Sequence, residues 1–194
     1  MAAHVRDGYG AFRQPEFECD CCEMLVFMIC CVRQNLHVFS LYHNPDVDDR
    51  IFDCLLASMA TVQTQDVRAF FLFAGDLNDH HQECWVLRQR TVVELQPLTS
   101  QLCDQLVVGP THALGDTLDL LMTDVPDIVR VAAEAQIGNS DHSCLSAVIS
   151  MAPAVPNLCV SGKVFLKLKY WLCMVKYGIC PGVTFCLLTI LLRL

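Results

Sequence analysis

The segment from Phe70 to Asn78 places polar side chains directly after a run of apolar ones. Its first four residues are all apolar, which is typical of a buried strand. Gly75 predicts that the backbone turns after this strand. Asp76 and Asn78 lie two positions apart, so an extended backbone would point both side chains to one face. Because open α/β folds hold their chemistry beyond strand ends, this segment is a candidate site. The alternative is that Asp76 only caps a turn.

A strand–helix–strand pattern leads up to this candidate site. Residues 36–42 are rich in apolar and β-prone side chains and predict a strand. From residue 48 to residue 63, apolar side chains recur at the spacing of one helix face. With the strand at 70–73, this order is typical of a layered α/β protein. Further strands are expected at residues 24–31, 103–109, 117–123, 129–133 and 145–151.

The length of 194 residues is enough for one domain with a substantial core. We expect this domain at residues 23–152. Residues 1–22 predict a poorly ordered lead-in, because their first fifteen positions are mostly polar and contain glycine. Residues 153–194 are expected to form a linker and an apolar tail, which contributes to an overall apolar content of 54%.

The charge and the cysteines limit the class of protein. A net charge of −8 argues against a general nucleic-acid-binding protein, which would be basic. It is compatible with an enzyme whose carboxylates hold a cation. The 13 cysteines lie mostly inside apolar runs, as small core residues do. Since the first fifteen residues show no secretory signal, we expect a reducing, intracellular location, in the nucleus or the cytoplasm.

Two further polar residues follow or interrupt apolar runs later in the chain. Asp119 lies inside the apolar run Leu118-Asp-Leu-Leu121. A carboxylate buried there must find a hydrogen-bond donor or lose its charge. A histidine is a suitable partner, because the carboxylate fixes the imidazole tautomer and raises its basicity. The alternative is that Asp119 faces solvent on an edge strand. Taken alone, His142 is more typical of a surface or core histidine than of a catalytic one.

Five short polar motifs are spread along the chain. They are Tyr42-His-Asn-Pro45, Gly75-Asp-Leu-Asn78, Pro110-Thr-His112, Thr117-Leu-Asp-Leu120 and Ser140-Asp-His142. Over residues 24–151 the chain resembles the endonuclease/exonuclease/phosphatase family, in particular the apurinic-site-type endonuclease domain of non-LTR (LINE-like) retrotransposons. The resemblance implies an α/β (α+β) fold, a partial four-layer α/β sandwich in which helices flank two packed sheets. It also implies Mg²⁺-dependent hydrolysis of a phosphodiester, with DNA as the partner and no small-molecule cofactor.

The resemblance also implies roles for individual catalytic residues. His142 would contact the scissile phosphate and be held by Asp119. Asp76 would orient or deprotonate the attacking water. Asn78 would hold that water or a phosphate oxygen, and Tyr42 would support the phosphate and the leaving group.

Three more residues would surround the phosphate and the metal. Asp141 matches the family's acidic residue near the metal ion. Ser140 and Thr111 would line the phosphate pocket. These assignments agree with the chemistry, because donors and a divalent cation must offset the negative charge of a phosphodiester in its transition state.

The chain departs from the family at the metal site. The family places a metal-binding glutamate in its first strands, and Glu16, Glu18 and Glu23 do not lie in such a motif. We therefore expect an N-terminally truncated domain that binds Mg²⁺ weakly or not at all. Residues 85–102 and 168–194 do not resemble the family either.

Other interpretations follow from these departures. The leading expectation is a DNA-endonuclease-like phosphodiester hydrolase fragment of retrotransposon origin with reduced or no activity. The first alternative is a non-catalytic remnant of the same fold. The chain could also be a small membrane protein whose apolar residues 171–192 insert in a bilayer. Sugar- or lipid-phosphatase activity within the same superfamily is a further alternative.

Overall fold

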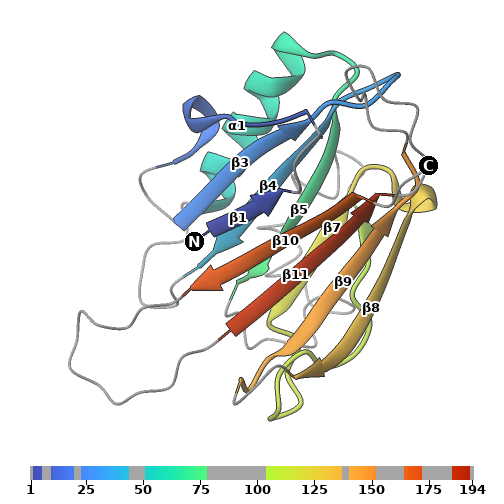
Figure 1. Cartoon of the computed structure of the whole chain (residues 1–194). Helices are drawn as coiled ribbons and strands as arrows, with labels where there is room; N and C mark the ends of the chain where they lie inside the picture. Colours follow the sequence, from blue (N-terminus) through green and yellow to red (C-terminus); the bar gives the residue numbers. More distant parts are fainter. Residues whose placement is uncertain are drawn as a thin grey trace.

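In the computed structural model, two β-sheets pack face to face and one helix covers the outer face of one of them (Figure 1). The structure describes residues 2–5, 10–19, 23–43, 51–77, 104–136, 140–151, 164–171 and 185–192. Within these residues, sheet A has the strand order β1-β10-β11-β9-β8 and sheet B has the order β2-β3-β4-β5-β7-β6. The α/β fold class expected from the sequence is confirmed. The described part supplies three layers of the expected sandwich, namely helix α1, sheet B and sheet A.

The strand–helix–strand unit forms the centre of sheet B. Strand β4 (Leu36–Tyr42), helix α1 (Ile51–Gln65) and strand β5 (Phe70–Asp76) follow in order. β4 and β5 pair in parallel, with Tyr42 opposite Asp76. The remaining strands of sheet B are β2 (Ala11–Arg13), β3 (Glu23–Ile29), β6 (Asp104–Gln105) and β7 (Asp119–Thr123).

Both faces of sheet B are buried, which explains its continuous apolar runs. In β4, Val38 lies in the core between the two sheets, whereas Phe39 lies in the core beneath α1. Leu55 and Met59 of α1 pack in this second core, at the spacing of one helix face. Burying side chains of this size stabilises the fold by about 1.5–3 kcal/mol each.

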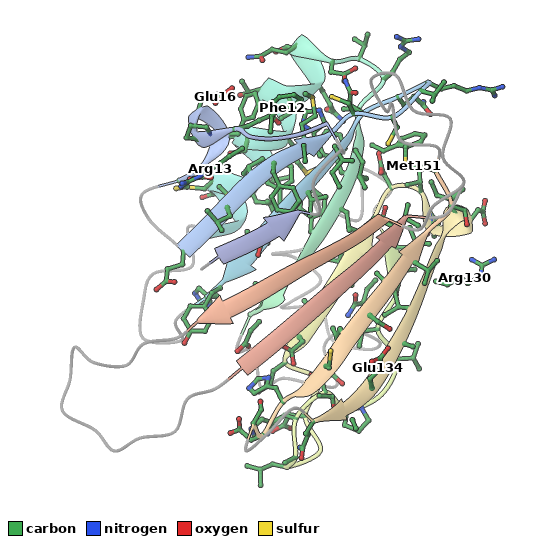
Figure 2. The ribbon with its side chains drawn as sticks, viewed as in Figure 1. Phe12, Arg13, Glu16, Arg130, Glu134 and Met151 are labelled. Carbon is green, nitrogen blue, oxygen red and sulfur yellow. The ribbon has the colours of Figure 1, made fainter. Side chains whose placement is uncertain are left out.

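Sheet A contains the C-terminal strands. Its strands are β1 (Ala2–Val5), β8 (Val129–Gln136), β9 (Ser143–Ile149), β10 (Val164–Trp171) and β11 (Phe185–Leu192). β11 lies between β10 and β9 and runs parallel to β9. Edge strand β8 carries the exposed, charged Arg130 and Glu134 (Figure 2), and charged side chains disfavour pairing with a further strand.

Several segments differ from the sequence expectation. Strands β1 and β2 and the 3-10 helix η1 (Pro15–Phe17) lie in the region expected to be a poorly ordered lead-in. β10 and β11 lie in the expected linker and apolar tail, where they extend sheet A. Within the described residues, no helix is both long enough and apolar enough to span a membrane. The atypical segment at residues 85–102 lies outside the described residues.

Two local expectations are corrected by the structure. Gly75 does not turn the backbone, because it lies inside β5 and pairs with Leu41 of β4. The strand expected at 103–109 is reduced to the two residues of β6, which pair with β7. A second 3-10 helix, η2 (Pro126–Ile128), leads directly into β8.

Candidate active site

One row of polar residues crosses the end of sheet B. The strand registers place Glu23 of β3 opposite Tyr42, Tyr42 opposite Asp76, and Asp76 opposite Asp119. Paired residues on neighbouring strands project to the same face of a sheet. Val38 lies four positions before Tyr42 in β4, so its side chain projects from the same face of the sheet. Because Val38 lies in the core between the two sheets, the polar row faces sheet A at the rim of that core.

The solvent exposure of the side chains decreases along this row. Glu23 is exposed and Tyr42 is half-buried, whereas Asp76 and Asp119 are 5% and 1% exposed. The two buried carboxylates therefore lie on adjacent strands, β5 and β7, where sheet B approaches the start of β9. Glu23 was not expected at this position from the sequence, because its place in the row depends on the antiparallel pairing of β3 with β4.

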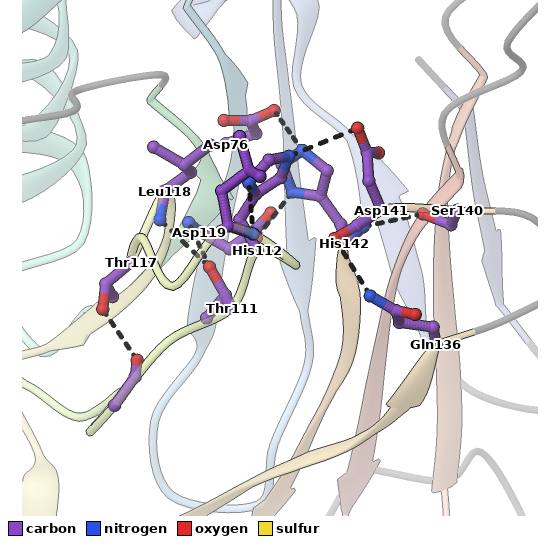
Figure 3. A network of polar contacts seen from close by, with 12 residues as sticks. Asp76, Thr111, His112, Thr117, Leu118, Asp119, Gln136, Ser140, Asp141 and His142 are labelled. Carbon is purple, nitrogen blue, oxygen red and sulfur yellow. Dashed lines mark hydrogen bonds and ion pairs between the residues drawn. The ribbon is translucent and has the colours of Figure 1, made fainter.

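A buried histidine from the other sheet meets these carboxylates. His142 immediately precedes β9, and its Nδ1 donates a hydrogen bond to Oδ2 of Asp119 over 2.8 Å (Figure 3). Its Nε2 lies 3.9 Å from Oδ2 of Asp76. The expected pairing of Asp119 with His142 is thus present, and Asp76 lies beside it.

The pKa of His142 is raised by this arrangement. Burial favours the neutral ring, but the hydrogen bond to Asp119 and the charges of Asp119, Asp76 and Asp141 favour the imidazolium and outweigh it. These carboxylates therefore favour the protonated form of the ring, in which Nε2 is a hydrogen-bond donor beside Asp76. Such a group can bind an anionic oxygen and can donate a proton.

A second histidine lies against the first. The Nε2 atom of His112 lies 3.2 Å from Oδ2 of Asp141, and the rings of His112 and His142 meet edge to face at 5.0 Å. A β-bridge between the two histidines holds them side by side. Partial burial opposes the charge of Asp141, but the hydrogen bond from His112 lowers its pKa below the ordinary value. Sequence reasoning noted the motif that contains His112 but assigned the residue no role.

The hydroxyl groups of Thr111 and Ser140 accept hydrogen bonds from the backbone of the site. The Oγ1 atom of Thr111 accepts hydrogen bonds from the backbone N–H groups of Leu118 and Asp119, each over 3.0 Å. The Oγ atom of Ser140 accepts from the backbone N–H of His142 over 3.1 Å. Both side chains are buried, at 0% and 5% exposure. Each therefore positions one member of the Asp119–His142 pair.

Of the residues expected at the site, the structure brings most to one place. Asp76, Asp119, Asp141 and His142 converge, and Tyr42 lies in the same row. Asn78 lies outside the described residues.

Among the residues that the structure describes, two groups of side chains are close enough to hold a metal ion. One comprises His112, Asp141 and His142, and the other comprises Asp76, Asp119 and His142. Within each group the possible ligand atoms lie within 4.8 Å of one another. Carboxylate oxygens are the protein ligands that Mg²⁺ prefers, usually one or two of them. Asp141 belongs to the first group and Asp76 to the second, so each group could offer at least one carboxylate oxygen to such an ion.

Comparisons with known proteins support the fold. No family model and no curated protein sequence matches the chain. Among solved structures, the endonuclease domain of TRAS1, a telomere-specific non-LTR retrotransposon, is similar at a TM-score of 0.54 and 18% identity. This match covers 70% of the present chain and 64% of the other, so the chain spans less than two thirds of that structure. The cytolethal distending toxin of Haemophilus ducreyi matches at a TM-score of 0.44 and 16% identity, covering 71% of this chain and 57% of that one.

At 18% identity, this likeness concerns the fold alone. The chain has an α/β fold with two packed sheets, similar to the fold of the TRAS1 endonuclease domain.

Proposed function

We propose that this chain is a metal-dependent phosphodiester hydrolase of the DNA endonuclease type, of retrotransposon origin. The observation that carries the proposal is the buried contact between Asp119 and His142, with Asp76 3.9 Å from the same ring. The similarity to the TRAS1 endonuclease domain supports DNA as the substrate class.

The proposed chemistry divides between the two sides of the His142 ring. Asp119 holds Nδ1 and stabilises the imidazolium, so that Nε2 donates to an oxygen of the scissile phosphate. Asp76 accepts a proton from the attacking water, which it holds for in-line attack. Tyr42 lies opposite Asp76 and supports the leaving group. Asn78, whose role follows from the resemblance, would hold the same water or a phosphate oxygen.

Asp141 is the proposed metal ligand, in the group that it forms with His112 and His142. When bound, Mg²⁺ would supply positive charge against the charge that develops on the phosphodiester. His112 keeps the Asp141 carboxylate in place through their 3.2 Å contact. Since the nearby groups include two imidazoles, which suit transition metals better than Mg²⁺, we expect weak Mg²⁺ binding.

A plasmid-nicking assay with the full chain and Mg²⁺ tests the proposal. We expect slow conversion of supercoiled to relaxed DNA, a complete loss on adding EDTA, and a fall of about 10²–10⁴-fold in both His142→Ala and Asp76→Ala. Asp127→Asn removes an exposed carboxylate on η2 and should leave the rate unchanged.

Two results would contradict this function. Equal residual nicking in the wild type, His142→Ala and Asp76→Ala would point to a contaminating nuclease. DNA binding without any cleavage, measured by fluorescence anisotropy across a range of Mg²⁺ concentrations, would identify a non-catalytic remnant of the fold.

A further inference from the structure

A second polar cluster lies at the opposite end of sheet B from the candidate active site. It surrounds His37, the second residue of β4, whereas Tyr42 of the active-site row is the last residue of that strand. Beside His37 is a pocket of about 280 Å³. The residues of this pocket used below are Gln14, Phe17, Asn35, His37, Val62 and Asp66.

The His37 ring presents an unused acceptor to this pocket. The side chain is 2% exposed, and its Nδ1 lies 2.9 Å from Oε1 of Gln14. Since the Gln14 oxygen can only accept, Nδ1 carries the proton and Nε2 has a lone pair. Nε2 is buried and has no hydrogen-bond partner in the described part of the chain. Burial lowers the pKa of His37, and the charge and hydrogen bonding of Asp66 oppose this shift in part.

A carboxylate lies close to this orphaned nitrogen. Oδ2 of Asp66 lies 3.7 Å from Nε2 of His37. Asp66 is held in that position because Oδ2 accepts from Nδ2 of Asn35 over 2.8 Å and Oδ1 accepts from the backbone N–H of Arg68 over 3.1 Å. In the Nδ1–H tautomer, two acceptors therefore face each other, and no described residue places a donor between them. A buried site normally avoids this arrangement.

We propose that this pocket binds a cationic hydrogen-bond donor, a guanidinium or a primary ammonium group, with His37 and Asp66 as its acceptors. The positive charge would be balanced by the Asp66 carboxylate, and one N–H would satisfy Nε2 of His37. Phe17 and Val62 supply apolar wall for the alkyl carbon attached to the cation. One imidazole and one carboxylate are fewer than the three or four protein ligands that a zinc site uses, so a metal ion fits this pocket less well.

The test uses NMR of the full chain with three small probes. Long-range ¹H–¹⁵N spectra of the imidazoles should show the Nδ1–H tautomer of His37. Methylguanidinium and methylammonium chloride are then titrated against methylurea, a neutral compound of similar shape to methylguanidinium. At least one of the cations should shift the His37 Nε2 and Asn35 amide signals saturably, with at least tenfold higher affinity than methylurea.

Matched variants separate this pocket from general charge effects. Asp66→Asn keeps the size of the side chain and should weaken binding of the cation at least tenfold. Asp53→Asn removes an exposed charge from α1 and should change nothing. If Asp66→Asn does not fold, the comparison of charged and neutral probes on the wild type still decides.

Three results would overturn the proposal. The first is a proton on Nε2 of His37, which would make that atom a donor. The second is equal affinity for methylurea and both cations. The third is a spectrum that no probe shifts saturably, which would mean that the pocket holds water only.

Discussion

Gly75 of β5 and the carbonyl group of Leu41 in β4 are so close that a side chain at position 75 cannot be accommodated. A Cβ atom built on Gly75 would overlap the Leu41 carbonyl oxygen and would lie 2.7 Å from its carbonyl carbon. The glycine is therefore required for close approach of two paired strands. Since Asp76 is the next residue, the same contact sets where the candidate general base enters the site.

Gly75→Ala should lower the free energy of unfolding by about 3 kcal/mol, because the β4–β5 ladder must open to admit the methyl group. Urea denaturation measures this loss. Gly115→Ala is the comparison, because Gly115 has a φ of 97° but open space around a Cβ. Gly115→Ala should lower the free energy of unfolding by about 1–2 kcal/mol. The backbone amide chemical shifts that change should be confined to the loop that contains Gly115. Unchanged β4 amide shifts in Gly75→Ala would contradict this account.

Asp119→Asn should reduce nicking by about 10²–10⁴-fold without unfolding the protein. The amide can still bond to Nδ1 of His142, but it supplies no negative charge to stabilise the imidazolium. The measurements are the nicking rate and the thermal midpoint. Asp104→Asn on β6 removes an exposed carboxylate from the same sheet and serves as control. A variant as active as the wild type would remove Asp119 from the proposed site.

His112→Gln should raise the Mg²⁺ concentration needed for half-maximal nicking by about tenfold. The histidine contacts Asp141 and no part of its proposed role involves the phosphate, so saturating Mg²⁺ should restore most of the rate. A Mg²⁺ titration of the nicking rate measures both quantities. A lower maximal rate at unchanged Mg²⁺ dependence would instead assign His112 a direct role in the reaction.

Arg13 and Glu18 make the fold sensitive to acid. Nε and Nη2 of Arg13 donate to the two carboxylate oxygens of Glu18 over 2.9 and 2.7 Å, and this contact lowers the pKa of Glu18. A lowered pKa stabilises the fold above the unfolded value of about 4.3, and this stability is lost as the pH falls through the folded value. Arg13→Gln should therefore reduce the shift in urea midpoint between about pH 5 and about pH 3.

The control for this acid response is Glu16→Gln. Glu16 is an exposed carboxylate in the 3-10 helix η1, two positions before Glu18. Its substitution should leave the acid response of the wild type unchanged. The same pH dependence in Arg13→Gln and the wild type would show that this ion pair is without effect on stability.

Local patterns were sufficient to predict the centre of sheet B. The strand at 36–42 is rich in β-prone side chains, and the helix that follows has a clear periodicity. The strand–helix–strand order is typical of the parallel pairing that is observed. That Asp119 needs a hydrogen-bond donor could also be predicted, because it lies in an apolar strand. The family resemblance then indicated His142 as that donor, and the structure shows this hydrogen bond.

The rest depends on tertiary pairing that no local pattern reports. Glu23 joins the polar row only through the register of β3 against β4. Residues 185–192 form a short apolar run, and such a run is compatible with a buried strand, a buried helix or a membrane segment. In the structure it forms β11, which pairs with β10 on one side and with the distant strand β9 on the other. His112 was missed because its contact with Asp141 is made by a bridge between distant loops.

The position of β11 has a consequence for synthesis of the protein. β9 can pair with β11 only after residues 185–192 have left the ribosome. In contrast, the last residue of strands β3, β4, β5 and β7 in sheet B is Thr123. Sheet B can thus form on the nascent chain before sheet A is complete. Until β11 is added, the edge of β9 that pairs with it is open. During that interval the growing polypeptide exposes the kind of strand that chaperones bind and that aggregates recruit.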